Sequence, residues 1–84
     1  MKFKTKIGII TLTTERKTHI ILHHPIIEDY LVNLKEVLEK PKEVRYSSRN
    51  DNVLLFYRYF AKIENGKYIV AVVNKTEKTV KTAY

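Results

Sequence analysis

The segment 53–63, VLLFYRYFAKI, restricts the fold more than any other part of the chain. Its residues are aliphatic or aromatic at both odd and even positions, as in a strand that is buried on both faces. Turn-forming residues precede it at 48–52, and the Asn65-Gly66 dipeptide that follows it is typical of a type I′ hairpin turn, in which both central positions need a positive φ. We therefore expect a strand in the interior of an antiparallel sheet.

Hydrophobic periodicity predicts the other elements. An apolar stripe of helical period predicts a helix from residue 26 or 27 to 40. Thr13 or Thr14 can cap a shorter helix that ends near His23, because Pro25 disfavours helical geometry at the residue before it. Patterns of period two predict strands at 3–12, 43–47, 67–73 and 78–84.

The expected fold is one α+β domain that covers residues 1–84. Two N-terminal helices pack on a mainly antiparallel sheet of four to five strands, in the order β-α-α-β-β-β-β. A 44% share of apolar residues suits such a packed core.

Cysteine is absent from the 84 residues, so the fold has no disulfides and nothing indicates an oxidising compartment. The run Ile7-Gly8-Ile9-Ile10 is too short for the core of a signal peptide or for a membrane span. We expect a cytoplasmic protein with no membrane partner.

The net charge of +7 is unevenly distributed. Residues 28–43 hold five acids and three lysines, a net of −2, whereas the remainder holds 13 cations and four acids, a net of +9. An electropositive sheet and first helix attract polyanions. The distribution therefore favours contact with a phosphate backbone over a purely solubilising role for the lysines.

Three histidines, His19, His23 and His24, mark the end of the first helix. His19 and His23 share a helix face with a spacing that can bind a metal, but the zincin pattern places Glu directly after the first His, where this chain has Ile20. We expect no metal and no other cofactor. His19 is the better catalytic candidate, because the helix is expected to present it toward the sheet and a neutral imidazole accepts a proton near pH 7. Each histidine can equally be a plain core or surface residue.

Arg58 interrupts a strand face that is otherwise apolar. A guanidinium on such a face needs an anion, a carbonyl group or an aromatic ring as its partner. Two interpretations stay open: Arg58 clamps a phosphate, or it lies near the strand's edge and pairs with a carboxylate of the second helix.

Hydroxyl groups and aromatic rings mark the predicted sheet. Val80, Thr82 and Tyr84 alternate in the last strand and are expected on one side, where the two hydroxyls can donate to a phosphate or merely form a polar strand end.

Tyrosines interleaved with cations are typical of base-stacking platforms, although at least two of them are expected to pack in the core. These residues are Tyr46, Tyr57, Tyr59 and Tyr68, with Arg45, Arg58 and Lys67.

Several short motifs occur together along residues 7–84: an H-P step at 24–25, P-x-x-V at 41–44 and a closing T-A-Y at 82–84. This combination resembles the phage and bacterial PBECR-type domains, which belong to the barnase–EndoU–colicin–RelE group of nucleases. Where that family usually has Arg-His-Pro-Glu, residues 23–26 read His-His-Pro-Ile.

The resemblance implies a metal-independent endoribonuclease that cleaves RNA through attack of the 2′-hydroxyl group. His19 would be its general base or acid, and Thr82 and Tyr84 would bind or polarise the scissile phosphate. The expected RNA-binding residues are His24, Arg16, Arg45, Arg58 and Tyr57.

The expected partners are RNA, either single-stranded or a tRNA or mRNA, and the cognate inhibitor protein of a toxin-like or mobile-element nuclease. Two alternatives stay open. One is a catalytically inactive RNA- or protein-binding module on the same fold, and the other is a subdomain that docks on a larger partner.

Overall fold

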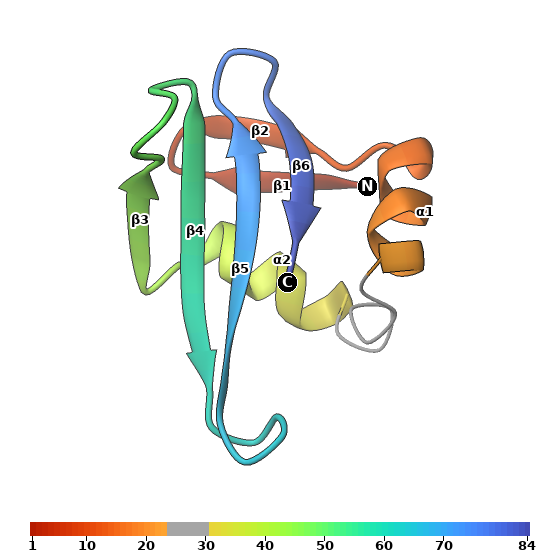
Figure 1. Cartoon of the computed structure of the whole chain (residues 1–84), viewed down its shortest axis with the longest axis vertical. Coiled ribbons are helices and arrows are strands. Elements are labelled where there is room, and N and C mark those ends of the chain that lie inside the picture. The colour runs from red at the N-terminus through yellow and green to blue at the C-terminus, as the bar shows by residue number, and fades with distance from the viewer. Residues whose placement is uncertain (24–30) are drawn as a thin grey trace.

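A computed structural model of the chain describes residues 1–23 and 31–84 (Figure 1). They form strands β1 Lys2–Thr5 and β2 Gly8–Thr11, helices α1 Thr14–His23 and α2 Leu31–Glu39, and strands β3 Glu43–Tyr46, β4 Val53–Phe60, β5 Lys67–Asn74 and β6 Thr79–Ala83. The strands make one sheet in the order β1-β2-β6-β5-β4-β3. Neighbouring strands are antiparallel except β2 and β6, which are parallel.

The fold class expected from the sequence is wrong. Two strands precede the helices where one strand was expected, the order is β-β-α-α-β-β-β-β, and the sheet is a curled, mixed sheet of six strands rather than a mainly antiparallel sheet of four to five. The expected strand 3–12 folds back on itself because Gly8 adopts a φ of 107°. The Thr5 hydroxyl closes this turn: it donates to the Gly8 carbonyl at 2.8 Å and accepts from the Ile7 N–H at 3.2 Å.

The two helices contribute unequally to the core. α2 lies behind β4 and β5 in Figure 1, and its residues Leu34, Val37 and Leu38 are fully buried with the strand residue Phe56. Burial of each such side chain contributes about 1.5–3 kcal/mol. α1 flanks β6 and buries only Ile20. Neither described helix has the length and apolar character that crossing a bilayer requires.

The helix expected from residue 13 or 14 to 23 is confirmed by α1. It begins as predicted, with the Thr13 hydroxyl accepting from the Arg16 N–H at 3.1 Å. The second helix is confirmed over Leu31–Glu39, and its expected first turn lies outside the described residues.

The β4–β5 hairpin turns earlier than the sequence predicts. Glu64 and Asn65 both have positive φ, 46° and 60°, and the Gly66 N–H donates to the Ile63 carbonyl at 2.7 Å. Two positive central angles define a type I′ turn, which is therefore centred one residue before the expected Asn65-Gly66.

A bulge in β6 decides which of its side chains face the core. The register with β5 shifts here, so that Lys81 is an extra residue in β6. Val80 and Ala83 are consequently both buried although they are three residues apart, and Thr82 and Tyr84 face the other side of the sheet. The expectation that Val80 shares a side with Thr82 and Tyr84 is wrong for this reason.

Candidate nucleic-acid interface

The side of strands β3–β6 that faces away from α2 carries none of the described helices, and it is the side that faces the viewer in Figure 1. Successive residues of a strand point to opposite faces, and Leu54, Phe56, Ile69 and Ala71 occupy the core side. Their neighbours therefore lie on the uncovered side, which we call the tyrosine face. It is defined by Arg45, Tyr57, Tyr59, Tyr68, Thr82 and Tyr84.

Two exposed rings form a fixed pair on this face. Tyr59 and Tyr68 lie directly opposite each other on β4 and β5, with ring centroids 5.1 Å apart in an edge-to-face arrangement. They are 49% and 58% exposed. The Tyr59 hydroxyl lies over Gly66, where a Cβ atom would come within 1.9 Å of it. The hairpin turn thus fixes the position of the Tyr59 ring.

Arg45 and Tyr57, both predicted to contact RNA, lie together on the tyrosine face. The guanidinium of Arg45 is 5.8 Å from the centroid of the Tyr57 ring. Its Nε atom donates to a carboxylate oxygen of Glu43 at 2.7 Å, and this hydrogen bond raises the pKa of Arg45 above its ordinary value. A permanent positive charge therefore stands beside an aromatic ring.

A row of paired residues joins Tyr57 to the end of the chain. Tyr57 pairs with Val70, and Val70 exchanges two backbone hydrogen bonds with Tyr84, of 2.7 and 2.9 Å. Val70 is only 7% exposed although none of the described helices covers it. Neighbouring side chains therefore shield it. Thr82, half-buried, precedes Tyr84 on the same face of β6.

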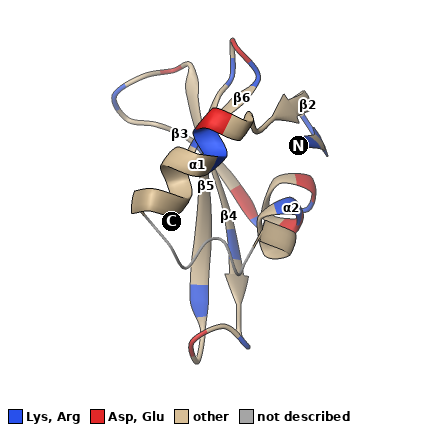
Figure 2. Cartoon of the chain, turned by 90° about the vertical axis from the view of Figure 1, so that its right-hand side faces the viewer, with Lys and Arg blue, Asp and Glu red and all other residues tan. Residues whose placement is uncertain are grey.

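The α1 histidines lie at the surface rather than in the core. His19 and His23 are both exposed, with ring centroids 4.5 Å apart, and Ile20 takes the buried position between them. Figures 1 and 2 show α1 alongside β6, the strand that carries Thr82. Arg16 is exposed on the same helix, and His24 lies outside the described residues.

Arg58 lies apart from the other predicted RNA-binding residues. It is in register with the buried Ile69, on the α2 side of the sheet. Its guanidinium donates to the Lys40 carbonyl at 2.7 Å, and its Nε atom lies 3.4 Å from a carboxylate oxygen of Glu36. The structure thus shows the pairing with a carboxylate of the second helix.

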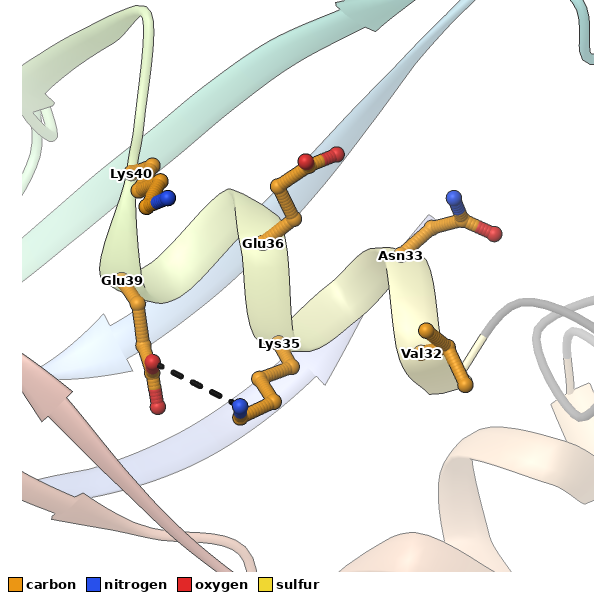
Figure 3. Close-up of a pocket in the computed structure, with 6 residues that line it drawn as sticks. All are labelled: Val32, Asn33, Lys35, Glu36, Glu39 and Lys40. Atoms are coloured by element: carbon orange, nitrogen blue, oxygen red, sulfur yellow. Dashed lines mark ion pairs between the residues drawn. The ribbon is translucent and has the colours of Figure 1, made fainter.

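A shallow hollow of about 350 Å³ lies on the outer side of α2, away from the tyrosine face (Figure 3). Its charged side chains are of both signs, and Lys35 pairs with Glu39 at 3.8 Å. It therefore has no preference for a polyanion. It is lined by Val32, Asn33, Lys35, Glu36, Glu39 and Lys40.

Metal ligands do not gather in the described part of the chain, where no three His, Asp or Glu side chains come together in a way that would hold an ion. In comparisons with known proteins, the chain matches no family model, no curated protein and no solved structure.

Proposed function

We propose that the protein binds single-stranded RNA on the tyrosine face. The observation that carries this proposal is the gathering of four tyrosines on one side of the sheet that no described helix covers. Two of their rings, Tyr59 and Tyr68, form an exposed pair, and Tyr57 has the cationic Arg45 beside it. The net charge of +7 adds an attraction for polyanions.

Unpaired bases are the ligands that such a surface suits. Each base that stacks on a tyrosine ring gains about 1–3 kcal/mol, and the net positive charge of the protein attracts the backbone whatever the sequence. A duplex keeps its bases stacked inside and offers no face to the rings. The proposal therefore distinguishes single strands from double-stranded RNA. The cytoplasmic location expected from the sequence is consistent with such a ligand.

Fluorescence anisotropy with a labelled single-stranded RNA at fixed salt tests this proposal. Tyr59→Ala and Tyr57→Ala should each weaken binding by about fivefold to a hundredfold, since each removes a stacking surface. Tyr46→Ala is the matched control, because Tyr46 is 62% exposed but in register with the core-facing Leu54. Equal effects of all three variants, or tighter binding of a duplex of the same sequence, would contradict the proposal.

RNA cleavage is a second candidate function, favoured by the exposed pair His19 and His23 on the helix that flanks β6. Two imidazoles can divide the work of a base and an acid. One takes the proton of the 2′-hydroxyl group, whose oxygen attacks phosphorus, and the other protonates the 5′-oxygen that leaves. Hydroxyls such as those of Thr82 and Tyr84 stabilise the charge on the phosphorane.

Cleavage is tested by incubating the protein with single-stranded RNA and EDTA, followed by detection of 2′,3′-cyclic phosphate ends. Activity should survive EDTA and fall by at least about a hundredfold in His19→Ala. Leu22→Ala is the control, since Leu22 is 74% exposed on the same helix. Binding without cleavage would leave a catalytically inactive RNA-binding module, and cleavage that persists in His19→Ala would exclude His19 from the site.

A further inference from the structure

The two edges of the sheet differ in how their backbone groups are used. At the β1 edge, α2 packs on the strand and a carboxylate oxygen of Glu39 accepts the Lys4 N–H at 3.3 Å. At the opposite edge, β3 is the outermost element in Figure 1, with no described segment beyond it. An unpaired strand edge is a template for another strand.

The outward backbone groups of β3 can be identified from its pairing with β4. The Ser47 N–H donates to the Val53 carbonyl at 2.9 Å, which makes these residues a hydrogen-bonded pair of the antiparallel ladder. Such pairs recur every second residue, so Arg45 and Glu43 turn their backbone groups toward β4. Val44 therefore turns its N–H and C=O groups outward, and so does Tyr46.

The side chains of β3 are complementary to a second copy of the same strand. In an antiparallel pairing centred on Val44, the two Val44 residues face each other and exchange backbone hydrogen bonds. Glu43 then lies opposite the partner's Arg45, and Arg45 opposite the partner's Glu43. Both side chains are exposed, 49% for Glu43 and 63% for Arg45, and they lie on the same face. Edge strands that resist pairing place like charges in such positions instead.

We propose that the protein forms a two-fold dimer in which β3 pairs antiparallel with β3 of a second copy, centred on Val44. The contact is isologous, as a two-fold axis requires. It joins two six-stranded sheets into one, with both tyrosine faces on the same side. Because β3 is only four residues long, the dimer is weak and its population depends on concentration. This dimer does not depend on RNA binding, because it uses the edge of the sheet.

Sedimentation equilibrium over a range of protein concentrations, at low salt and without RNA, tests this dimer with a charge swap. In a dimer of Arg45→Glu, both contacts between position 43 of one copy and position 45 of the other bring two carboxylates together. In a dimer of Glu43→Arg, both contacts bring two guanidiniums together. Each variant alone should dimerise about tenfold more weakly than the wild type. The double variant Glu43→Arg/Arg45→Glu restores both pairs and should dimerise like the wild type.

An equimolar mixture of Arg45→Glu and Glu43→Arg provides the sharpest measurement, since opposite charges then meet in both positions and a heterodimer should form at wild-type strength. Circular dichroism confirms that each variant is folded, and the double variant and the mixture keep the test valid if one single variant is unstable. A wild type that stays monomeric at the highest concentration would overturn the proposal. So would a dimer that none of the charge changes weakens.

Discussion

The guanidinium of Arg58 on β4 donates a hydrogen bond of 2.7 Å to the carbonyl oxygen of Lys40, the residue that follows the last turn of α2. The carbonyl groups at the end of a helix lack partners within the helix and carry a partial negative charge. A cation from the sheet therefore satisfies one of them and fixes the C-terminal end of α2 over the core. The nearby Glu36 carboxylate adds an ion pair.

Replacement of Arg58 by methionine should destabilise the fold by about 1–2 kcal/mol, because the Lys40 carbonyl loses its charged donor while the apolar stem is kept. Urea denaturation measures this change. Arg49→Met in the β3–β4 turn is the control and should change the free energy of unfolding by less than about 0.5 kcal/mol, since Arg49 is exposed. The RNA affinity of the folded protein should decrease only slightly, and by the same factor, in Arg58→Met and Arg49→Met. A selective loss of affinity in Arg58→Met would indicate a phosphate clamp.

The same substitution at two positions of α2 should separate burial from helix propensity. Val37 is fully buried, and Val37→Ala should cost about 2 kcal/mol through the lost methyl groups and the cavity they leave. Val32 is 81% exposed, so Val32→Ala should be neutral or stabilise slightly, because alanine favours the helix. Thermal unfolding compares the two, and similar losses would contradict the packing described for α2.

Glu64 occupies a left-handed backbone conformation that costs a residue with a Cβ atom about 1–2 kcal/mol. Glu64→Asn should stabilise the fold by about 0.5–1 kcal/mol, since asparagine tolerates positive φ. The ion pair to Lys67 that it removes is worth little, because the two charged groups are 4.0 Å apart and both are partly exposed. Glu77→Asn makes the same replacement at an exposed turn residue whose φ is not positive. Equal effects on the melting temperature would show that charge, and not φ, matters.

Periodicity predicts the elements whose local pattern and packing agree. The stripe of α2 is found over Leu31–Glu39, because burial of one helix face leaves a strong signal in the sequence. The strand expected at 53–63 is found as β4, but it ends at Phe60 and is not buried on both faces, since Tyr59 is 49% exposed. The N-terminal hairpin left a weak signal. Ile7-Gly8-Ile9-Ile10 reads as a continuous strand, and the turn there depends on one hydroxyl and one glycine.

Strand register decides which side of the sheet each predicted site residue faces and which residue lies opposite it. One extra residue in a strand or a turn changes that register. Regular alternation of side chains along a strand predicts that Val80 shares a sheet face with Thr82 and Tyr84. The bulge at Lys81 interrupts this alternation, so that Val80 faces the core instead. A turn centred on Asn65-Gly66 would have placed Val72 opposite Tyr59. The ladder instead ends at the pair Phe60 and Lys67, and the longer connection between them places Tyr68 opposite Tyr59. This register creates the ring pair, whereas the sequence predicts the two tyrosines only as separate members of a stacking platform.

Gly66 serves the hairpin in two ways that a double-mutant cycle can separate. Its φ of 110° disfavours any side chain, and a Cβ atom would overlap the Tyr59 hydroxyl. Gly66→Ala should therefore destabilise the fold by more than about 1 kcal/mol and lower the affinity for single-stranded RNA, because the Tyr59 ring must move. Urea denaturation and anisotropy measure the two effects.

In the Tyr59→Ala background the overlap is gone, so Gly66→Ala should cost only the backbone strain. The two substitutions should then be non-additive by about 0.5 kcal/mol or more in stability, and Gly66→Ala should no longer change RNA affinity. If the changes in unfolding free energy of the two substitutions are additive, the whole destabilisation by Gly66→Ala comes from its backbone angle and none from overlap with the Tyr59 ring. A loss of affinity that persists without the Tyr59 ring would mean that Gly66 acts on RNA by a route other than that ring.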